Sequence, residues 1–213
     1  PVTLKIYDKT EIAHGKSRYQ IVEQPQFKTT NPVYPHRRGD IMLLINGMPV
    51  YHIELKKSNV DITHAEVQIE KYMANNAFTG IFSLVQVFVA MNPEDAVYYA
   101  NPGPDGKFNS AYYFHWTDSQ NNYIREWDKF THSLLMIPRA HEIIGFYTVP
   151  DATDGILKVL RPYQIYAALD IFDKVSKSHW TKSEQKAGYI WHTTGSGKTL
   201  TSFKTAQLIA NLG

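Results

Sequence analysis

The sequence contains no cysteine, so it has no disulfide framework and no thiolate metal site. It also lacks an apolar stretch long enough to span a bilayer, and its first residues lack the pattern of a signal peptide. We therefore expect no membrane partner, and the absence of cysteine fits the reducing cytoplasm. The net charge of +2 over 213 residues is small, so composition alone does not indicate a nucleic-acid-binding protein.

The rest of the sequence alternates between strand-like and helix-like segments, which predicts an α/β fold. Beyond the hairpin described next, strands are expected at residues 18–23, 84–91, 96–101 and 112–116, and helices at 61–73, 121–136 and 161–174. Residues 143–149 fit either a helix end or a strand. The polar, turn-rich stretch 150–155 is the expected boundary between a domain at 1–150 and a second one at 151–213.

The most informative segment is GDIMLLINGMPVYHIELKKS, at residues 39–58. Two apolar runs are joined by Asn46-Gly47, a strong signal for a β-hairpin. Asp40 opens the first run, and Glu54 and Lys56 close the second. Two carboxylates suit a hard divalent cation such as Mg²⁺, and a lysine can orient water or stabilise negative charge on a phosphate. Ordinary charged residues at solvated strand ends can produce the same spacing.

The alternation of side chains along the second strand places His52, Glu54 and Lys56 on one face. A strict two-residue turn puts Asp40 opposite Ile53 and turns it away from Glu54. A three-residue loop or a β-bulge puts Asp40 directly opposite Glu54, and we predict one of these. His52 is expected to support the site or to approach DNA.

A helix is expected directly after the hairpin, with Asp61 as its N-cap. Gln68 and Tyr72 lie four positions apart on this helix and share one face. The same spacing fits an ordinary polar face with one packed tyrosine. Basic residues at 36–38 and 56–57 flank the acidic positions, and they suit either phosphate contacts or a solvated cluster.

A second chemical motif lies near the end of the sequence. Residues 188–192 fit a strand, residues 193–199 form the glycine-rich loop TTGSGKT, and residues 200–212 fit a helix. This order is the context that a phosphate-binding P-loop requires. The backbone N–H groups around Gly195, Ser196 and Gly197 are expected to cradle phosphates. Lys198 is expected to reach the β- and γ-phosphates of ATP, and Thr199 to bind its Mg²⁺.

The helices on either side of this loop carry further expectations. Arg161-Pro-Tyr-Gln164 opens the helix before the loop, as a proline in a first helical turn commonly does. In the helix after the loop, four apolar residues are expected to contact the core, namely Leu200, Phe203, Leu208 and Leu212.

Asp40, Glu54-x-Lys56 and Gln68-x-x-x-Tyr72 together resemble the PD-(D/E)xK nucleases with an added Q-x-x-x-Y motif. With the glycine-rich loop, the sequence is similar to the restriction (R) subunit of type I restriction-modification enzymes. The resemblance covers nearly the whole chain and includes residues 78–80, 99–102, 113–116, 161–164 and 191–199. It implies a mixed sheet flanked by helices, followed by the start of a RecA-like helicase domain. Gly39 departs from the motif, whose name has proline there.

The resemblance also implies a role for each matching residue. Asp40 and Glu54 would bind Mg²⁺, and Lys56 would assist the attack of water. Gln68 and Tyr72 would steady DNA or the catalytic carboxylates.

Two further roles follow from the resemblance. Arg161-Pro-Tyr-Gln164 is similar to the Q-motif of helicases, in which Gln164 would read the adenine edge. An additional acidic residue sometimes joins such nuclease sites, and either Glu11 or Glu23 would serve.

The function implied by the resemblance is Mg²⁺-dependent cleavage of unmodified double-stranded DNA, coupled to ATP-dependent translocation. Methylation and specificity subunits are the implied partners. Because the sequence starts at Pro1 and ends one helix after the loop, we expect a fragment of a longer subunit that hydrolyses ATP poorly by itself. Two alternatives remain open: a non-catalytic DNA-binding or coupling module, and a stand-alone helicase with a nuclease-like domain.

Overall fold

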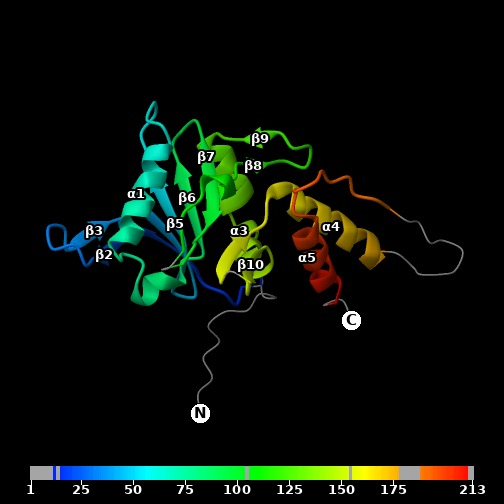
Figure 1. The fold of residues 1–213 in the computed structure, drawn as a ribbon, viewed down its shortest axis with the longest axis horizontal. Helices are drawn as coiled ribbons and strands as arrows, with labels where there is room; N and C mark the ends of the chain where they lie inside the picture. Colours follow the sequence, from blue (N-terminus) through cyan, green and yellow to red (C-terminus); the bar gives the residue numbers. More distant parts are fainter. Residues whose placement is uncertain (1–11, 13–14, 104–105, 154, 178–187, 211–213) are drawn as a thin grey trace, which may run out of the picture. The chain divides into compact units, whose positions relative to one another are not determined.

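The computed structural model of the protein describes residues 12, 15–103, 106–153, 155–177 and 188–210. The chain forms two compact units, one from residues 1–116 and 123–159 and the other from residues 117–122 and 160–213 (Figure 1). The predicted boundary between residues 150 and 151 falls inside strand β10 (Thr148–Asp151). This strand pairs with β11 (Ile156–Val159), and both belong to the first unit.

The first unit is built on a five-stranded mixed sheet with the strand order β1-β4-β5-β6-β7. Its strands are β1 (Tyr19–Glu23), β4 (Ile41–Ile45), β5 (Met48–Leu55), β6 (Val87–Met91) and β7 (Ala96–Ala100). β5 and β6 run parallel, and the other neighbours run antiparallel. All five residues of β6 are buried, which confirms the prediction of a central strand there.

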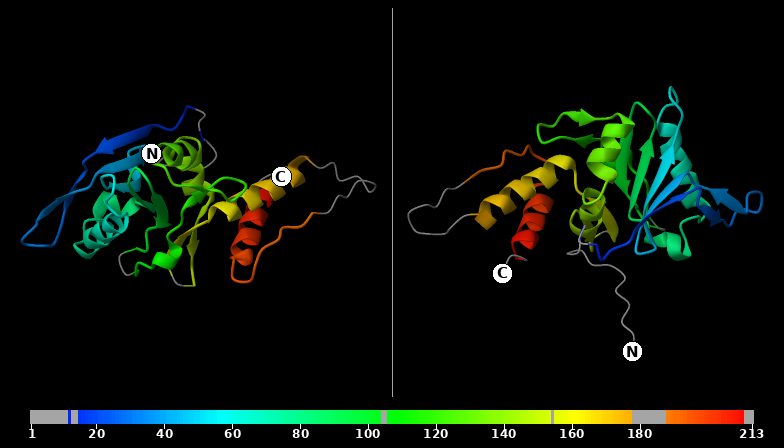
Figure 2. Two further views of the ribbon diagram at one scale, coloured as in Figure 1. Left: turned by 90° about the horizontal axis from the view of Figure 1, so that it is seen from above. Right: turned by 180° about the vertical axis from the view of Figure 1, so that it is seen from behind.

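Helices cover both faces of this sheet (Figures 1 and 2). Helix α1 (Thr63–Ala74) connects the parallel strands β5 and β6 and packs on one face through Ala65, Ile69 and Tyr72, which are buried. On the other face, the Tyr51 hydroxyl of β5 donates a hydrogen bond of 3.0 Å to the Ala140 carbonyl in α3 (Arg139–Phe146). Since short helices are marginal alone, packing on the sheet is what holds α1 in place.

The remaining elements of the first unit lie between or beside these layers. Strands β2 (Gln26–Lys28) and β3 (His36–Arg38) form a separate hairpin. A 3₁₀ helix, η1 (Gly80–Leu84), precedes β6, and another, η2 (Ser110–Tyr112), follows β7. Residues 143–149 contain both of the predicted alternatives, a helix end and a strand, because α3 ends at Phe146 and β10 begins at Thr148.

Two predictions for the segment after β7 hold only in part. The strand expected at residues 112–116 begins late, because Tyr112 still belongs to η2, whose N-cap Asn109 accepts the N–H of Ala111. Phe114 then forms an antiparallel bridge with Tyr98 of β7, and Trp116 opens β8 (Trp116–Thr117). The helix expected at 121–136 begins late, after strand β9 (Tyr123–Ile124), as α2 (Trp127–Phe130) followed by a π-helical turn, η3 (Thr131–Leu135).

In the second unit, helix α4 (Pro162–Lys177) packs against helix α5 (Lys198–Ala210). The start of α4 confirms the predicted helix opening. The strand expected at residues 188–192 is absent, because no described strand pairs with this segment and an isolated strand lacks hydrogen-bond partners. Tyr189 and Trp191 in it are exposed.

The predicted core face of α5 is also wrong. The buried residues of this helix are Thr201, Lys204 and Thr205, whereas Phe203 is 53% exposed. Leu200 and Leu208 are only partly buried, and Leu212 lies outside the described residues. The start of α5 is fixed by hydrogen bonds from α4 to the preceding loop, and these decide which face meets α4. No described helix of either unit is long and apolar enough to cross a membrane.

Candidate active site

The β4–β5 hairpin sets the geometry of the first candidate site. Asn46 and Gly47 form a two-residue turn with φ values of 52° and 81°, and Ile45 pairs with Met48. The register then shifts, since Leu44 pairs with Pro49 and Leu43 with Tyr51, which leaves Val50 as a bulge. The predicted bulge is therefore confirmed, together with the two-residue turn.

The bulge brings Asp40 into line with Glu54. Ile41 pairs with Ile53, so the next position of the ladder places Asp40 opposite Glu54. Asp40 Oδ2 accepts a hydrogen bond of 2.7 Å from the Leu55 N–H. This bond uses one carboxylate oxygen to hold the two strand ends together, and the other oxygen stays available at the end of β5.

The fully buried carboxylate of Glu54 lies between the side chains of Lys56 and His52. Lys56 Nζ lies 3.5 Å from Glu54 Oε1, and His52 Nε2 lies 3.2 Å from Glu54 Oε2. Neither Glu54 Oε2 nor either ring nitrogen of His52 makes a hydrogen bond within the described residues. A buried carboxylate oxygen without a hydrogen bond is costly, so this atom has an unused capacity for a ligand.

A chain of hydrogen bonds connects Lys56 to helix α1. Lys56 Nζ donates to Gln68 Oε1 at 2.8 Å, and Gln68 Nε2 donates to the Tyr72 hydroxyl at 2.6 Å. The Tyr72 hydroxyl donates in turn to the Arg38 carbonyl at 2.8 Å. Burial, together with the negative charge of Glu54 and Asp40, raises the pKa of Tyr72 to about 12. Tyr72 therefore stays a neutral donor at physiological pH.

The structure thus brings together all five residues predicted for this site. The spacing of Gln68 and Tyr72 signals a shared helix face, but it does not say that this face meets Lys56. The other acidic candidates differ in position. Glu23 is exposed on β1, where it pairs with Ile41, and Glu11 lies outside the described residues.

The environment of His52 is a feature that sequence patterns do not indicate. Its ring is fully buried among aromatic rings, with centroids 5.3 Å from Phe78, 5.7 Å from Phe27 and 5.9 Å from Tyr72. A Cβ atom built on Gly39 would lie 2.5 Å from His52 Cε1. The Gly39 N–H also donates to the Pro25 carbonyl at 3.0 Å. Proline at this position would lose that hydrogen bond and collide with His52, which explains the departure from the motif.

The residues present fit a hard divalent cation. Asp40 and Glu54 supply the oxygen ligands that Mg²⁺ prefers, and Glu54 Oε2 has no hydrogen-bond partner in the described chain. No cluster of three or more histidine or acidic residues suited to a metal occurs among the described residues. Two carboxylates are sufficient for Mg²⁺, because this ion keeps several of its waters and binds proteins through one or two carboxylates.

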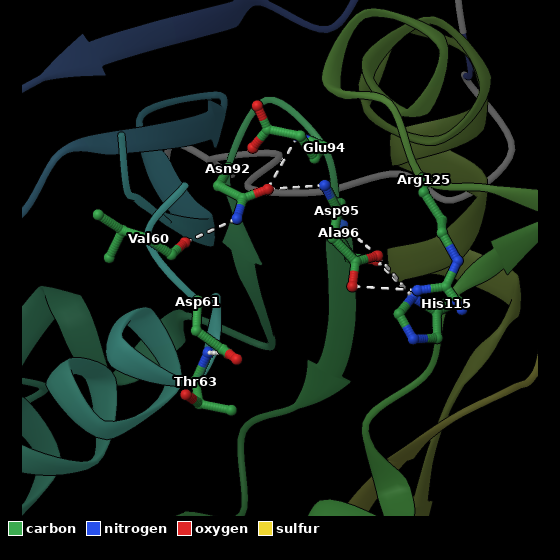
Figure 3. Close-up of polar contacts among 9 residues, drawn as sticks. All are labelled: Val60, Asp61, Thr63, Asn92, Glu94, Asp95, Ala96, His115 and Arg125. Atoms are coloured by element: carbon green, nitrogen blue, oxygen red, sulfur yellow. Dashed lines mark hydrogen bonds and ion pairs between the residues drawn. The ribbon is translucent and has the colours of Figure 1, made fainter. Parts of the chain in front are cut away.

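A separate polar cluster fixes the chain that leaves the site (Figure 3). The Asn92 side chain, in the turn between β6 and β7, donates to the Val60 carbonyl at 2.7 Å, just before α1. Asp95 in the same turn lies 3.2 Å from His115 Nδ1 and 3.2 Å from an Arg125 nitrogen. This cluster positions the start of α1, and so it indirectly positions Gln68.

The second candidate site is the glycine-rich loop before α5. Gly195 and Gly197 have φ values of 76° and 78°, in the left-handed region that glycine adopts without strain. Lys198 is the first residue of α5, and its Nζ donates to the Thr193 carbonyl at 3.2 Å. Thr199 follows it in the exposed first turn of the helix.

Gln164 contacts this loop directly. It is buried, and its Nε2 lies 3.2 Å from the Gly197 carbonyl and 3.3 Å from that of Ser196. The neighbouring Tyr163 hydroxyl donates to the Ser196 carbonyl at 2.7 Å, a contact that the sequence does not signal. Gln164 therefore supports the loop backbone in this structure, whereas its contact with adenine stays a prediction.

Fold and site together define a mixed α/β protein with an acid–lysine cluster at a strand end and a glycine-rich loop in a second unit. The family model described as "Type I restriction enzyme R protein N terminus" matches residues 1–107. The chain belongs to this family of type I restriction enzyme R proteins. The model described as "SWI2/SNF2 ATPase" matches residues 163–212.

Several similar proteins are endonuclease subunits of type I restriction enzymes. Endonuclease subunits of type I restriction enzymes match over 195 residues, with 34% identity for Staphylococcus aureus (strain COL) and 36% for Staphylococcus saprophyticus. Both alignments cover 92% of this chain and 20% of the relative. The endonuclease subunit of the Escherichia coli enzyme EcoprrI is 30% identical over 178 residues, which cover 83% of this chain and 55% of that protein. The chain therefore spans about a fifth of the staphylococcal relatives' length.

Proposed function

We propose that the first unit is a PD-(D/E)xK nuclease, which cleaves double-stranded DNA with Asp40, Glu54 and Lys56. The observation that carries this proposal is the bulged register, because it aligns Asp40 with Glu54 and leaves Lys56 on the same face. The family supports it, since the relatives are named endonuclease subunits. Asp40 and Glu54 would hold Mg²⁺. The chemistry expected of that ion is a lowered pKa for bound water and neutralised charge on the phosphate.

Lys56 is positioned to act beside these carboxylates. Its amino group is held by Gln68 at 2.8 Å and lies 3.5 Å from Glu54, so its direction is fixed before substrate arrives. A preorganised cation is more effective than a mobile one, because the protein needs no rearrangement when negative charge develops. In the proposed reaction Lys56 orients the attacking water or stabilises charge on the phosphate. Gln68 and Tyr72 hold Lys56 in place.

The second unit is proposed to bind ATP through residues 195–199. The support is local: two left-handed glycines, a lysine at the first residue of a helix, and the family match to an ATPase. The N-terminus of α5 favours a phosphate, because its unpaired N–H groups point outward. Lys198 would exchange its bond to Thr193 for one to the β- and γ-phosphates. Thr199 would bind Mg²⁺ with the nucleotide.

For the longer protein, we propose the restriction subunit of a type I restriction-modification complex. ATP-driven translocation of duplex DNA would bring the nuclease to cleave unmodified DNA, with methylation and specificity subunits as partners. The proposal rests on the relatives' names and on the order of the two candidate sites along the chain.

The test is the variant Glu54→Ala in the full-length subunit, assembled with its partner subunits. We expect DNA cleavage to disappear while ATP hydrolysis and translocation persist, because the two candidate sites lie in different units. Lys129→Ala is the matched control, since it removes an exposed charge of the first unit that pairs, within the described chain, only with the exposed Glu126. Cleavage that survives Glu54→Ala contradicts the assignment and favours a non-catalytic coupling module.

A further inference from the structure

The β2–β3 hairpin carries a basic face that the proposed chemistry does not use. Its register pairs Lys28 with His36 and Gln26 with Arg38, and these four side chains are exposed on one face. Phe27, between them on the opposite face, is fully buried. We call these four residues, Gln26, Lys28, His36 and Arg38, the basic hairpin face. The sequence has no acidic residue between positions 23 and 40, so no carboxylate within the hairpin neutralises this face.

The two cations of this face, Lys28 and Arg38, also lack acidic partners elsewhere in the part of the chain that the structure describes. Neither Lys28 nor Arg38 forms an ion pair with any residue that the structure describes. The exposed Lys129 of the same unit differs, because it pairs with Glu126 at 2.7 Å. The basic hairpin face therefore presents uncompensated positive charge to solvent.

The hairpin is held rigidly at its base and its middle. At the base, the Gly39 N–H donates to the Pro25 carbonyl at 3.0 Å. In the middle, the Phe27 ring packs in the core, with its centroid 4.9 Å from Phe82 and 5.4 Å from Phe78. The buried side of the hairpin is thus part of the main core, and only the basic face is left to solvent.

The loop at the hairpin tip is held as well, by the end of helix α1. Asn31 Nδ2 donates to Asn75 Oδ1 at 3.0 Å, and the Thr30 N–H donates to the Asn75 carbonyl at 3.1 Å. Asn76 Nδ2 donates to Thr30 Oγ1 at 3.1 Å. A surface that is ordered before binding loses little conformational entropy when a ligand arrives.

The basic hairpin face is connected to the candidate nuclease site through the backbone. The Arg38 carbonyl accepts the hydroxyl of Tyr72, which belongs to the chain of hydrogen bonds that holds Lys56. Arg38 also stands only two residues before Asp40. A polymer bound along this face would therefore lie beside the carboxylates.

We propose that the basic hairpin face binds the sugar-phosphate backbone of duplex DNA next to the cleavage site. This inference rests on the proposed nuclease function. Charge complementarity indicates this ligand. Lys28 and Arg38 are cations without acidic partners, and each is paired across the strands with a polar side chain, which suits a row of phosphates. All four residues of the face are polar, and the exposed apolar residues of the hairpin, Val33 and Tyr34, lie in its tip loop. The face itself therefore lacks the apolar centre typical of a protein interface. Lys28 and Arg38 supply the charge, and Gln26 and His36 supply further hydrogen bonds.

The experiment is the affinity of this chain for a short fluorescein-labelled DNA duplex, measured by anisotropy in EDTA over a range of salt concentrations. The variant is Lys28→Ala/Arg38→Ala, which keeps the backbone bonds of the hairpin. We expect about tenfold weaker binding at low salt and a log–log salt slope shallower by about two, one for each lost phosphate contact. The conservative variant Lys28→Arg/Arg38→Lys should retain the wild-type slope, and thermal unfolding of each variant reports on folding.

The matched control is Lys107→Ala/Lys129→Ala, which removes two exposed charges elsewhere on the same unit. An unchanged slope for Lys28→Ala/Arg38→Ala overturns the proposal. Equal losses in both double variants overturn it too, because binding then follows net charge alone. Cleavage is measured separately with Glu54→Ala. If that variant still cuts while the hairpin variant loses binding, the catalytic assignment fails and the DNA-binding face stands.

Discussion

At the scale of single residues, the candidate nuclease site depends on one buried carboxylate and its neighbours. Glu54 is fully buried, yet one of its oxygens has no hydrogen bond within the described chain. His52 lies beside that oxygen in an aromatic enclosure that leaves no room for a side chain on Gly39. Glycine at position 39 and histidine at position 52 therefore depend on each other, and we expect substitutions at the two positions to be coupled.

The variant Gly39→Ala tests this coupling. The added Cβ would lie 2.5 Å from His52 Cε1 and 3.0 Å from a ring carbon of Phe27, so the core must shift. We expect the free energy of unfolding, measured in urea, to fall by about 1–3 kcal/mol. Gly188→Ala is the control, since nothing lies within 4 Å of its added Cβ. Gly39→Ala/His52→Ala should lose less stability than the two single variants added together, and simple additivity contradicts the coupling.

Tyr72 gives a prediction of pH dependence. Its pKa is raised to about 12 in the folded protein, above the ordinary value of 10.0. The folded state therefore holds the phenol proton more tightly than the unfolded state does. The resulting contribution to the free energy of unfolding is fully present below pH 10.0 and is lost as the pH rises through about 12. Tyr72→Phe removes this dependence, and it also costs about 0.5–1.5 kcal/mol at neutral pH through the lost bond to Arg38.

The measurement for Tyr72 is the difference in unfolding free energy between Tyr72→Phe and the wild type, followed from neutral to alkaline pH. Burial also raises the pKa of Tyr147, to about 12, so only the difference isolates Tyr72. We expect the difference to narrow as the pH rises above 10.0. A constant difference across this range would show that Tyr72 titrates normally in the folded protein.

At the scale of elements, the β4–β5 hairpin decides whether the site exists. The turn at Asn46-Gly47 is a local pattern that the sequence shows plainly, whereas the bulge at Val50 has no sequence signal of its own. An irregularity is predicted only because Asp40 and Glu54 otherwise face opposite sides of the sheet. The need for Asp40 and Glu54 to share one face predicts a shift in strand register, and the structure places that shift at Val50.

Gly47→Ala tests the turn. Gly47 has a φ of 81°, where a side chain is strained, so we expect a loss of roughly 1–2 kcal/mol in unfolding free energy. Gly47→Asn should lose less, because asparagine tolerates this backbone region better than alanine does. Equal stability of Gly47→Ala and the wild type would show that the turn relaxes into another geometry.

Other elements were predictable to different degrees. Local patterns were sufficient for α1 and β6, whose periodicity and apolar content agree with their environments. Local patterns also predicted β1, although its apolar residues Ile21 and Val22 are exposed. They placed the strand expected at residues 112–116 too early, because Tyr112 still belongs to the 3₁₀ helix capped by Asn109. They also misplaced the buried face of α5, since contacts from Tyr163 and Gln164 to the glycine-rich loop orient that helix. Such tertiary contacts have no signature in local periodicity.

At the scale of the whole molecule, the chain places two candidate sites in two compact units. The residues of the candidate nuclease site belong to the first unit, and the glycine-rich loop belongs to the second. Because the chain covers about a fifth of the staphylococcal relatives' length, the coupling between cleavage and ATP use is a property to be tested in the full-length protein.

Lys198→Ala in the full-length subunit tests the separation of the two sites. We expect ATP hydrolysis to fall about a hundredfold or more, because a cation directed at the phosphates is lost. Duplex binding by the first unit should be unchanged, since Lys198 belongs to the second unit. The control is Lys177→Ala, which removes an exposed lysine of the same unit. Lys204 is not suitable, because it is buried. ATP hydrolysis that survives Lys198→Ala contradicts the assignment of the loop.

The most direct test of the nuclease site is the position of a bound cation. Crystals of this chain soaked in Mn²⁺, which shares the oxygen preference of Mg²⁺, would reveal the ion by its anomalous scattering. We expect one peak between the carboxylates of Asp40 and Glu54, and we expect it to disappear in Glu54→Gln. A peak elsewhere on the first unit, with none at these carboxylates, would contradict the proposed catalytic site.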